Sequence, residues 1–137
     1  MATGGPGLVA VGSVCLPACL GAGSGGIAAT SLNGSSWSVE PVTGTAELRD
    51  VASSGGQVFA LGVSNQDVEQ QAALELWRTD DGVAWQRVTG LPSIPDLVSY
   101  ASADIAASSD RLIIVGWAEV AGPDATRNFS YSSPPGS

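Results

Sequence analysis

The side chains that this 137-residue chain offers for chemistry lack some types, and this lack excludes several reaction classes. The sequence has no histidine, which is the commonest general base and the commonest metal ligand in proteins. A Ser-His-Asp triad, a Cys-His pair and a histidine-bearing zinc site are therefore excluded within it. The adjacent carboxylates Asp80 and Asp81 fall far short of the roughly six oxygen ligands that calcium takes. We predict no metal site, no cofactor and no catalytic residue in this chain.

Two cysteines, Cys15 and Cys19, stand in the segment VCLPACLG, with Pro17 favouring a turn between them. Their spacing suits a small disulfide loop. The alternative is a redox or metal pair, but C-x3-C is not the thioredoxin spacing and two thiolates do not complete a zinc site. We favour the disulfide, which implies an oxidising compartment, extracellular or in the cell envelope. The N-terminal segment MATGGPGLVAVG has no basic region and no long apolar run, so it does not read as a signal peptide.

The charge and composition of the chain limit its partners and its fold. The formal net charge is −8, with five arginines and no lysine, so we expect neither nucleic acid nor an anionic membrane surface as a partner. No apolar run approaches the ~20 residues of a membrane-spanning helix. Hydrophobic residues make up 44% of the chain and charged residues 13%, a globular composition. Eighteen glycines, eight prolines and the lack of helical periodicity favour strands.

An internal repeat indicates how these strands are organised. Three short apolar segments end in glycine and recur at nearly equal intervals: GLVAVG at 7–12, QVFALG at 57–62 and RLIIVG at 111–116. The segments LRDVASSGG and SADIAASSD precede the second and third copies and align Asp50 with Asp104. The segments SLNGSSW, at 31–37, and TDDGVAW, at 79–85, follow the first and second copies. A period near 50 with short strands and frequent turn signals is typical of a β-propeller blade.

One repeat is predicted to form four antiparallel strands, the second of which is apolar enough to be buried on both faces. The third and fourth strands would meet at Asn33-Gly34 and at Asp81-Gly82, because Asn-Gly and Asp-Gly favour the two-residue type I′ turn. Trp37 and Trp85 would begin the outer strand and lay their rings over the blade edge. The hydroxyls of the preceding Ser31 and Thr79 would form local turn hydrogen bonds.

At these residues the sequence resembles the Asp-box, or BNR, repeat of sialidase-like β-propellers. The family's box is written S-x-D-x-G-x-T-W, whereas SLNGSSW and TDDGVAW are one residue shorter, Asn33 replaces the aspartate, and Ala84 lacks the hydroxyl. The repeats are thus degenerate. The resemblance implies an all-β fold of four-stranded blades and a structural role for the boxes, with a surface calcium or sugar contact as the alternative role. The residues concerned are Ser31, Asn33, Gly34, Trp37, Thr79, Asp81, Gly82 and Trp85.

The repeat predicts one partial propeller domain over residues 1–137, with about ten strands or two and a half blades. We expect blade one at 5–44 without its inner strand, blade two at 45–92, and blade three at 100–137 without its outer strand. A closed propeller has roughly four to eight blades. The chain is therefore expected to be a piece of a longer propeller, to close a ring with further copies of itself, or to form an open stack.

Two hypotheses for function follow. The favoured one is a non-catalytic propeller segment that acts as a scaffold or as a surface for a protein or glycan ligand. The alternative is a fragment of a sialidase-like glycoside hydrolase whose catalytic residues lie mostly in missing blades. Catalytic sialidases use three arginines, a tyrosine–glutamate pair and an aspartate, and no arginine here has a context that matches. We interpret Arg49, Asp50 and Asp104 as solvated strand ends.

The cysteine spacing gives the first testable prediction. Protein from an oxidising compartment is expected to contain the Cys15–Cys19 bond, so its unreduced mass should be lower by two hydrogen atoms than after reduction. The gain in stability should be modest, because a loop this short removes little entropy from the unfolded chain. Mass spectrometry with and without reductant is the measurement, and a Cys19→Ser variant is the control. Two alkylatable thiols per chain in the unreduced sample would contradict the prediction.

Overall fold

The computed structural model describes residues 2–4, 7–15, 24–42, 47–63, 74–88, 91, 97–120 and 126–133. All of these residues lie in strands or in short connections, and the predicted all-β class is confirmed. Among them there is no helix long and apolar enough to cross a membrane. The strands are β1 (Ala2–Gly4), β2 (Gly7–Cys15), β3 (Ser24–Ser31), β4 (Ser38–Val42), β5 (Glu47–Ser54), β6 (Gln57–Val63), β7 (Leu74–Thr79), β8 (Gln86–Val88), β9 (Leu97–Ala107), β10 (Leu112–Val120) and β11 (Thr126–Ser133).

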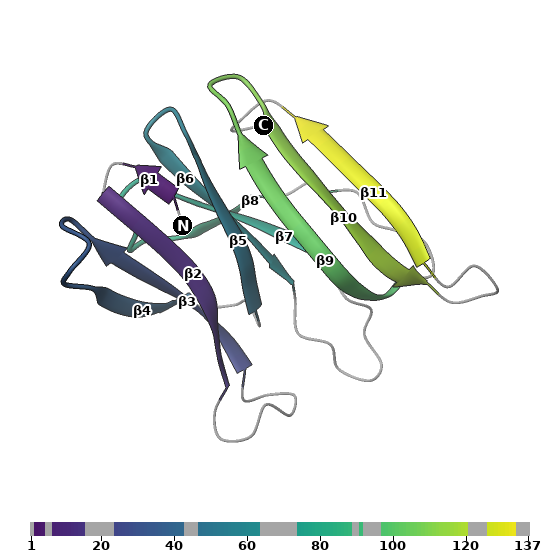
Figure 1. Ribbon diagram of the computed structural model, residues 1–137, viewed down its shortest axis with the longest axis horizontal. Coiled ribbons are helices and arrows are strands. Elements are labelled where there is room, and N and C mark those ends of the chain that lie inside the picture. The colour runs from purple at the N-terminus through teal and green to yellow at the C-terminus, as the bar shows by residue number, and fades with distance from the viewer. Residues whose placement is uncertain are drawn as a thin grey trace.

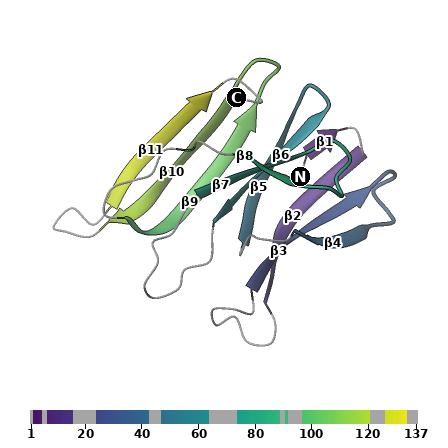
Figure 2. The ribbon, with the colours of Figure 1, turned by 180° about the vertical axis from the view of Figure 1, so that it is seen from behind.

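The strands form three antiparallel sheets, and within each sheet every strand pairs with the next one along the chain. The orders are β1-β2-β3-β4, β5-β6-β7-β8 and β9-β10-β11. We call these the first, second and third sheets. They lie side by side in chain order, from purple through teal to yellow-green, so that the first and third sheets occupy opposite ends (Figure 1). The view from behind shows the same order reversed (Figure 2).

The described strands differ from the predicted repeat boundaries in the first and third sheets. The second sheet spans 47–88, inside the expected 45–92, and the third has three described strands, beginning at Leu97. The first sheet has a strand where we expected none: β1 pairs with β2, with Ala2 opposite Val9. This corrects the expectation of a missing inner strand. The sequence ATG is too short and too poor in apolar residues for alternation to reveal a strand.

The core consists of two layers, one on each side of β6. Val58 and Ala60 belong to a cluster with Val9 and other residues of the first sheet. Phe59 and Leu61 point to the opposite face and belong to a cluster with residues of the third sheet. All four β6 side chains are fully buried. The sequence predicted this double burial for the second strand of a repeat, and β6 is the central strand on which both neighbouring sheets pack.

Hydrogen bonds from β5 join the second sheet to the third. The carboxylate of Asp50 accepts the N–H of Val51 on Oδ1 at 2.9 Å and the N–H of Ile105, on β9, on Oδ2 at 2.9 Å. The hydroxyl of Ser54 donates to the carbonyl oxygen of Ser108. Asp50 is therefore half-buried and bonded, which corrects its interpretation as a solvated strand end. A register shift between Leu48 and Asp50 interrupts the alternation there, so the face on which the carboxylate lies was not evident from the sequence.

Glycine is required at the end of one of the three repeated apolar segments. A Cβ atom added to Gly116, on β10, would collide with the carbonyl oxygen of Ser102 and lie 3.0 Å from the Cα atom of Ala103, both on β9. The equivalent Gly12, on β2, has room, since an added Cβ would meet only the Cγ1 atom of Ile27, at 4.0 Å. The same repeated residue thus has a packing role in the third sheet that it lacks in the first.

The two glycines make a matched pair for mutation. Gly116→Ala is expected to lower the free energy of unfolding by roughly 1–3 kcal/mol, because the backbone of β9 must move to admit the methyl group. Gly12→Ala should change that free energy by no more than about 0.5 kcal/mol. Urea unfolding followed by tryptophan fluorescence measures both. Equal losses in the two variants would show that the close approach of β9 to Gly116 is not what requires the glycine.

Candidate functional site

The residues singled out in the sequence occupy two equivalent loops, one in the first sheet and one in the second. The first loop, residues 32–37, joins β3 to β4, and the second, residues 80–85, joins β7 to β8. The flanking pairs are Thr30 opposite Ser38 and Arg78 opposite Gln86, so the strands on either side of each loop pair in the same register. Each motif is thus brought together within its own loop, and the two loops belong to separate sheets.

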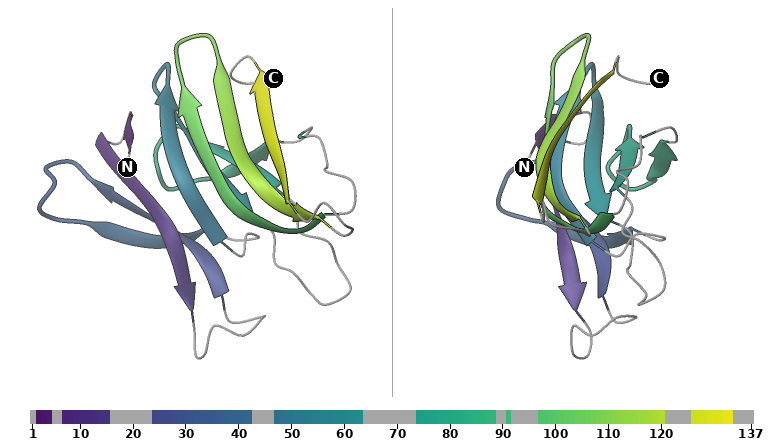
Figure 3. Two further views of the ribbon diagram at one scale, coloured as in Figure 1. Left: turned by 45° about the vertical axis from the view of Figure 1, so that its right-hand side comes forward. Right: turned by 90° about the vertical axis from the view of Figure 1, so that its right-hand side faces the viewer.

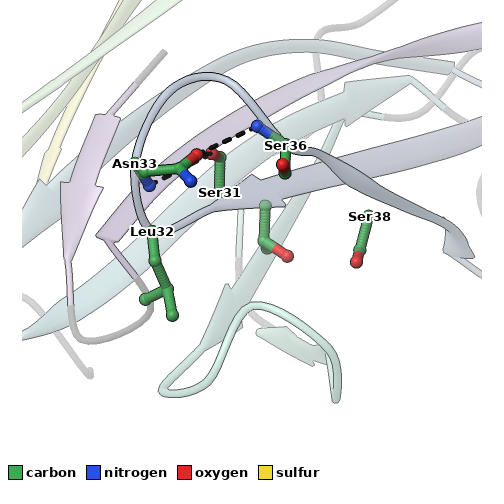
Figure 4. Close-up of a pocket in the computed structure, with 6 residues that line it drawn as sticks. Ser31, Leu32, Asn33, Ser36 and Ser38 are labelled. Carbon is green, nitrogen blue, oxygen red and sulfur yellow. Dashed lines mark hydrogen bonds between the residues drawn. The ribbon is translucent and has the colours of Figure 1, made fainter.

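In the first loop, two side chains satisfy most of the backbone donors. The hydroxyl of Ser31 accepts the N–H of Gly34 at 2.8 Å and the N–H of Asn33 at 3.3 Å, and it donates to Asn33 Oδ1 at 3.3 Å. Asn33 Oδ1 also accepts the N–H groups of Ser35 at 2.8 Å and Ser36 at 2.9 Å. Figure 4 shows the Asn33 side chain turned into the loop, toward Ser31 and the backbone of Ser36. The loop is therefore held by its own side chains.

The second loop repeats this network bond for bond. The hydroxyl of Thr79 accepts the N–H of Gly82 at 2.9 Å and the N–H of Asp81 at 3.3 Å, and it donates to Asp81 Oδ1 at 3.1 Å. Asp81 Oδ1 accepts the N–H groups of Val83 at 2.8 Å and Ala84 at 2.9 Å. The local bonds expected of the two hydroxyls are thus present, and five equivalent bonds hold each loop.

The turn type differs from the one expected. The sequence predicted a two-residue type I′ turn, but six residues separate Ser31 from Ser38, and six separate Thr79 from Gln86. The glycines do have positive φ, 77° at Gly34 and 78° at Gly82. The side-chain oxygen of Asn33 or Asp81 bonds the N–H groups two and three residues ahead, which widens the loop instead of reversing the chain at the Asn-Gly or Asp-Gly pair. The tryptophans consequently precede the outer strands rather than beginning them.

The two tryptophans have different surroundings although their positions are equivalent. Trp37 is 38% exposed, and its Nε1–H donates to the carbonyl oxygen of Gly34 at 3.3 Å. Trp85 is half-buried and packs against the core cluster between the first and second sheets. Its Nε1 atom is buried and has no hydrogen-bond partner among the described residues. The first ring therefore closes its own loop, and the second ring packs on the core.

Each loop lies beside a hollow, and the lining residues of the two hollows correspond one to one. The first has a volume of about 320 Å³ and is lined by Thr30, Ser31, Leu32, Asn33, Ser36 and Ser38. The second has a volume of about 110 Å³ and is lined by Arg78, Thr79, Asp80, Asp81, Ala84 and Gln86. Positions outside the shared network differ in chemistry, with Leu32 in one loop and Asp80 in the other. The loops thus share their internal bonding and not a common ligand-facing surface.

The acidic residue of the second loop is held in its charged form by the bonds that it accepts. The N–H groups of Ala84 and Val83 and the hydroxyl of Thr79 lower the pKa of Asp81 below its usual value, and the N–H of Ala84 has the largest effect. In the first loop, the neutral Asn33 accepts equivalent bonds. The loop geometry therefore requires an acceptor oxygen at this position, while the negative charge is particular to the second loop.

A buried carboxylate on the second sheet was missed by the sequence analysis. Glu75 is 3% exposed, and its Oε2 atom accepts the Nε1–H of Trp77 at 3.1 Å. Its Oε1 atom lies 3.4 Å from Nη2 of Arg87, whose side chain is 55% exposed. The only signal in the sequence is the alternation in LELWRT, which places Glu75 and Trp77 on one face of a strand. The bonds to both partners indicate a structural role.

The remaining predicted residues give no further cluster in the part of the chain that the structure describes. Arg49 lies on β5, Arg78 on β7, Arg127 on β11, and Arg111 is exposed just before β10. No group of three or more acidic or cysteine residues there could hold a metal ion. Cys15 ends β2, but Cys19 lies outside the described residues, so their pairing stays a prediction.

Comparison with known proteins identifies the fold. No protein-family model and no curated protein matches the sequence. Among solved structures, the chain is similar to a GH32 β-fructofuranosidase of Bombyx mori in complex with sucrose, with a TM-score of 0.55 and 18% identity over 80% of this chain. That protein has a five-bladed β-propeller. The fold here is a partial β-propeller. The match spans 26% of the length of the fructofuranosidase chain, and at this identity the similarity concerns the fold alone.

The bonds to Asp81 predict a pH dependence. The pKa of Asp81 is lower in the folded chain than in the unfolded chain, so ionised Asp81 stabilises the fold at pH values above its unfolded pKa. This contribution is lost as the pH falls through the pKa of Asp81 in the folded chain. Between about pH 5 and pH 2, unfolding free energy should therefore fall more steeply in the natural protein than in Asp81→Asn. Urea unfolding at several pH values measures the difference. Asp80→Asn, which alters the adjacent exposed carboxylate, is the control, and an equal loss of slope in both variants would contradict the prediction.

Proposed function

We propose that the chain is a non-catalytic segment of a degenerate BNR, or Asp-box, β-propeller that acts as a scaffold and as a surface for a protein or glycan ligand. The observation that carries the proposal is the repeated loop network, in which five equivalent hydrogen bonds join Ser31 to Asn33 and Thr79 to Asp81 and each pair to its loop. A hydroxyl, an acceptor oxygen, a glycine with positive φ and a tryptophan stand at the same four places in both loops.

The bonding of two carboxylates, Asp50 and Glu75, supports a structural role for them over a catalytic one. Both oxygens of Asp50 accept backbone N–H groups that join two sheets. Both oxygens of Glu75 are engaged, one by Trp77 and one by Arg87. A carboxylate that acts as a general acid or base needs an oxygen atom that can exchange a proton with the substrate. These two acidic groups are instead fixed inside or between sheets.

The hollow beside the first loop is the surface best suited to a ligand. The Ser31 hydroxyl and the Asn33 carbonyl oxygen are occupied by the loop itself, but the hydroxyls of Thr30, Ser36 and Ser38 also line the hollow. Trp37 lies at the end of the same loop and is partly exposed. Hydroxyl groups beside an aromatic ring suit a sugar ring or a polar protein side chain. We therefore place the ligand-binding surface of the proposal there.

The alternative is that the chain is a fragment of a sialidase-like glycoside hydrolase. Its support is the structural neighbour, a β-fructofuranosidase in complex with sucrose. The arginines of this chain nevertheless lie on four different strands and one connection. A carboxylate-binding cluster of the sialidase type would need three of them at one site.

An activity assay separates the two functions. The purified chain is expected to release no product from a fluorogenic sialoside or from sucrose, because the carboxylates of Asp50 and Glu75 are bonded within the fold. Product formation is measured by fluorescence and by reducing-sugar release, with a sialidase and a β-fructofuranosidase as positive controls. Turnover that disappears in Asp50→Asn but persists in Glu40→Gln would establish the hydrolase alternative instead.

A further inference from the structure

One face of the third sheet presents a row of large apolar side chains to solvent. Ile113, Val115 and Trp117, alternate residues of β10, are 43%, 44% and 41% exposed. The residues between them point to the other face, where Leu112 and Ile114 are buried in the core. In Figure 1 and in the left panel of Figure 3, β7 and β8 lie behind the third sheet, whose opposite face is turned toward the viewer. We call this exposed row the β10 row.

The equivalent row in the second sheet shows what such residues do when they are covered. Alignment of QVFALG with RLIIVG sets the β10 row against Phe59, Leu61 and Val63 on β6. These three are at most 3% exposed, because they pack against the third sheet. The β10 row is therefore in register with an existing sheet–sheet interface within the same chain, one repeat further on.

A polar contact of that interface is also open on the third sheet. Asp104 is the equivalent of Asp50, whose carboxylate accepts the N–H of Ile105 from the neighbouring sheet. Asp104 stands opposite Val115 in the register, on the same face as the β10 row. Asp104 is exposed, and its carboxylate has no hydrogen-bond partner among the residues that the structure describes. Equivalents of both the apolar residues and the carboxylate of that interface thus lie together on the third sheet.

The other end of the molecule presents the complementary face. Val58 and Ala60 of the second sheet are covered by the first sheet. Their equivalents on β2 are Leu8 and Ala10, which are only half-buried. Ala10 stands opposite Ala29, and Ala29 opposite Val39, so these three residues share a face on which Val39 is 57% exposed. The first sheet therefore has a free apolar face of the kind that β6 offers to its neighbour.

We propose that the β10 row of one copy of this chain binds the face formed by Leu8, Ala10, Ala29 and Val39 on a second copy, in a head-to-tail arrangement. The contact would repeat the packing of the second sheet on the third. Because the two faces differ, the contact is heterologous, and it closes a ring where the rotation allows. Two copies supply six sheets, within the roughly four to eight of a closed propeller. Only the ring rests on the proposed propeller function; the contact rests on the two exposed faces.

Charge does not prevent this association. The net charge of −8 makes two copies repel each other, but that repulsion is screened beyond about 8 Å at physiological salt. The burial of apolar surface acts at the contact itself and does not depend on charge. A contiguous row of isoleucine, valine and tryptophan side chains is the kind of patch that marks an interaction site. We therefore expect self-association to strengthen when salt is added.

Two charge variants test the proposal. Val115→Glu places a charge in the β10 row, and Val39→Lys places one in the opposite face. Light scattering after size-exclusion chromatography should give a mass of at least twice 13.7 kDa for the natural chain and the monomer mass for each variant alone. An equimolar mixture should regain the larger mass, because each variant keeps one intact face. Val83→Glu and Val83→Lys, at a 62% exposed loop residue, are the matched controls and should associate normally.

Each other outcome is decisive. A natural chain that stays monomeric at all concentrations overturns the proposal. Loss of association in Val115→Glu but not in Val39→Lys shows that β10 rows pair with each other, which overturns the head-to-tail contact. Failure of the mixture to associate, with both variants folded by circular dichroism, does the same. None of these results bears on the loop networks or on the hydrolase assay, so the proposed function is tested separately.

Discussion

The packing of β6 between two sheets is the interaction on which the rest of the structure depends. Val58 and Ala60 face one neighbour while Phe59 and Leu61 face the other, and all four side chains are fully buried. Each large side chain contributes about 1.5–3 kcal/mol when it is removed from water. A strand with apolar residues on both faces gains most from burial when a layer packs on each side. The positions of the first and third sheets on either side of the second follow from this one strand.

The loops illustrate how one geometry is built from unlike side chains. Asn33 and Asp81 accept the same set of bonds, and Ser31 and Thr79 supply the same hydroxyl. The network therefore needs a short side chain with an acceptor oxygen, placed two residues after a hydroxyl, and it needs no charge. This chemical tolerance explains why the repeat can diverge at its other positions while the strands on either side keep their pairing.

The sequence predicted the strands better than the connections between them. The repeated segment GLVAVG lies within β2 and QVFALG within β6, because the apolar run and the repeat agree there. The motif residues Asn33 and Asp81 were singled out from the sequence, but the wide loop was not predicted. The side-chain oxygen of Asn33 competes with a two-residue chain reversal for the nearby N–H groups, and the sequence does not show which of the two prevails. The role of Asp50 was missed because its partner, the N–H of Ile105, is far away in the sequence and a register shift hides the direction of the side chain.

The β6 and β10 strands carry similar apolar sequences, so their different exposure is a property of their neighbours and not of their folding. In the proposed contact, Asp104 limits which surfaces can cover the β10 row. If an unrelated apolar surface covered the β10 row, it would also cover the carboxylate beside Val115 and leave that charge buried without a donor, which is costly. A sheet that offers a backbone N–H at the place where Ile105 meets Asp50 avoids this cost. Under the proposal, Asp104, the equivalent of the carboxylate that joins two sheets inside the chain, therefore favours a surface built like another sheet of the repeat.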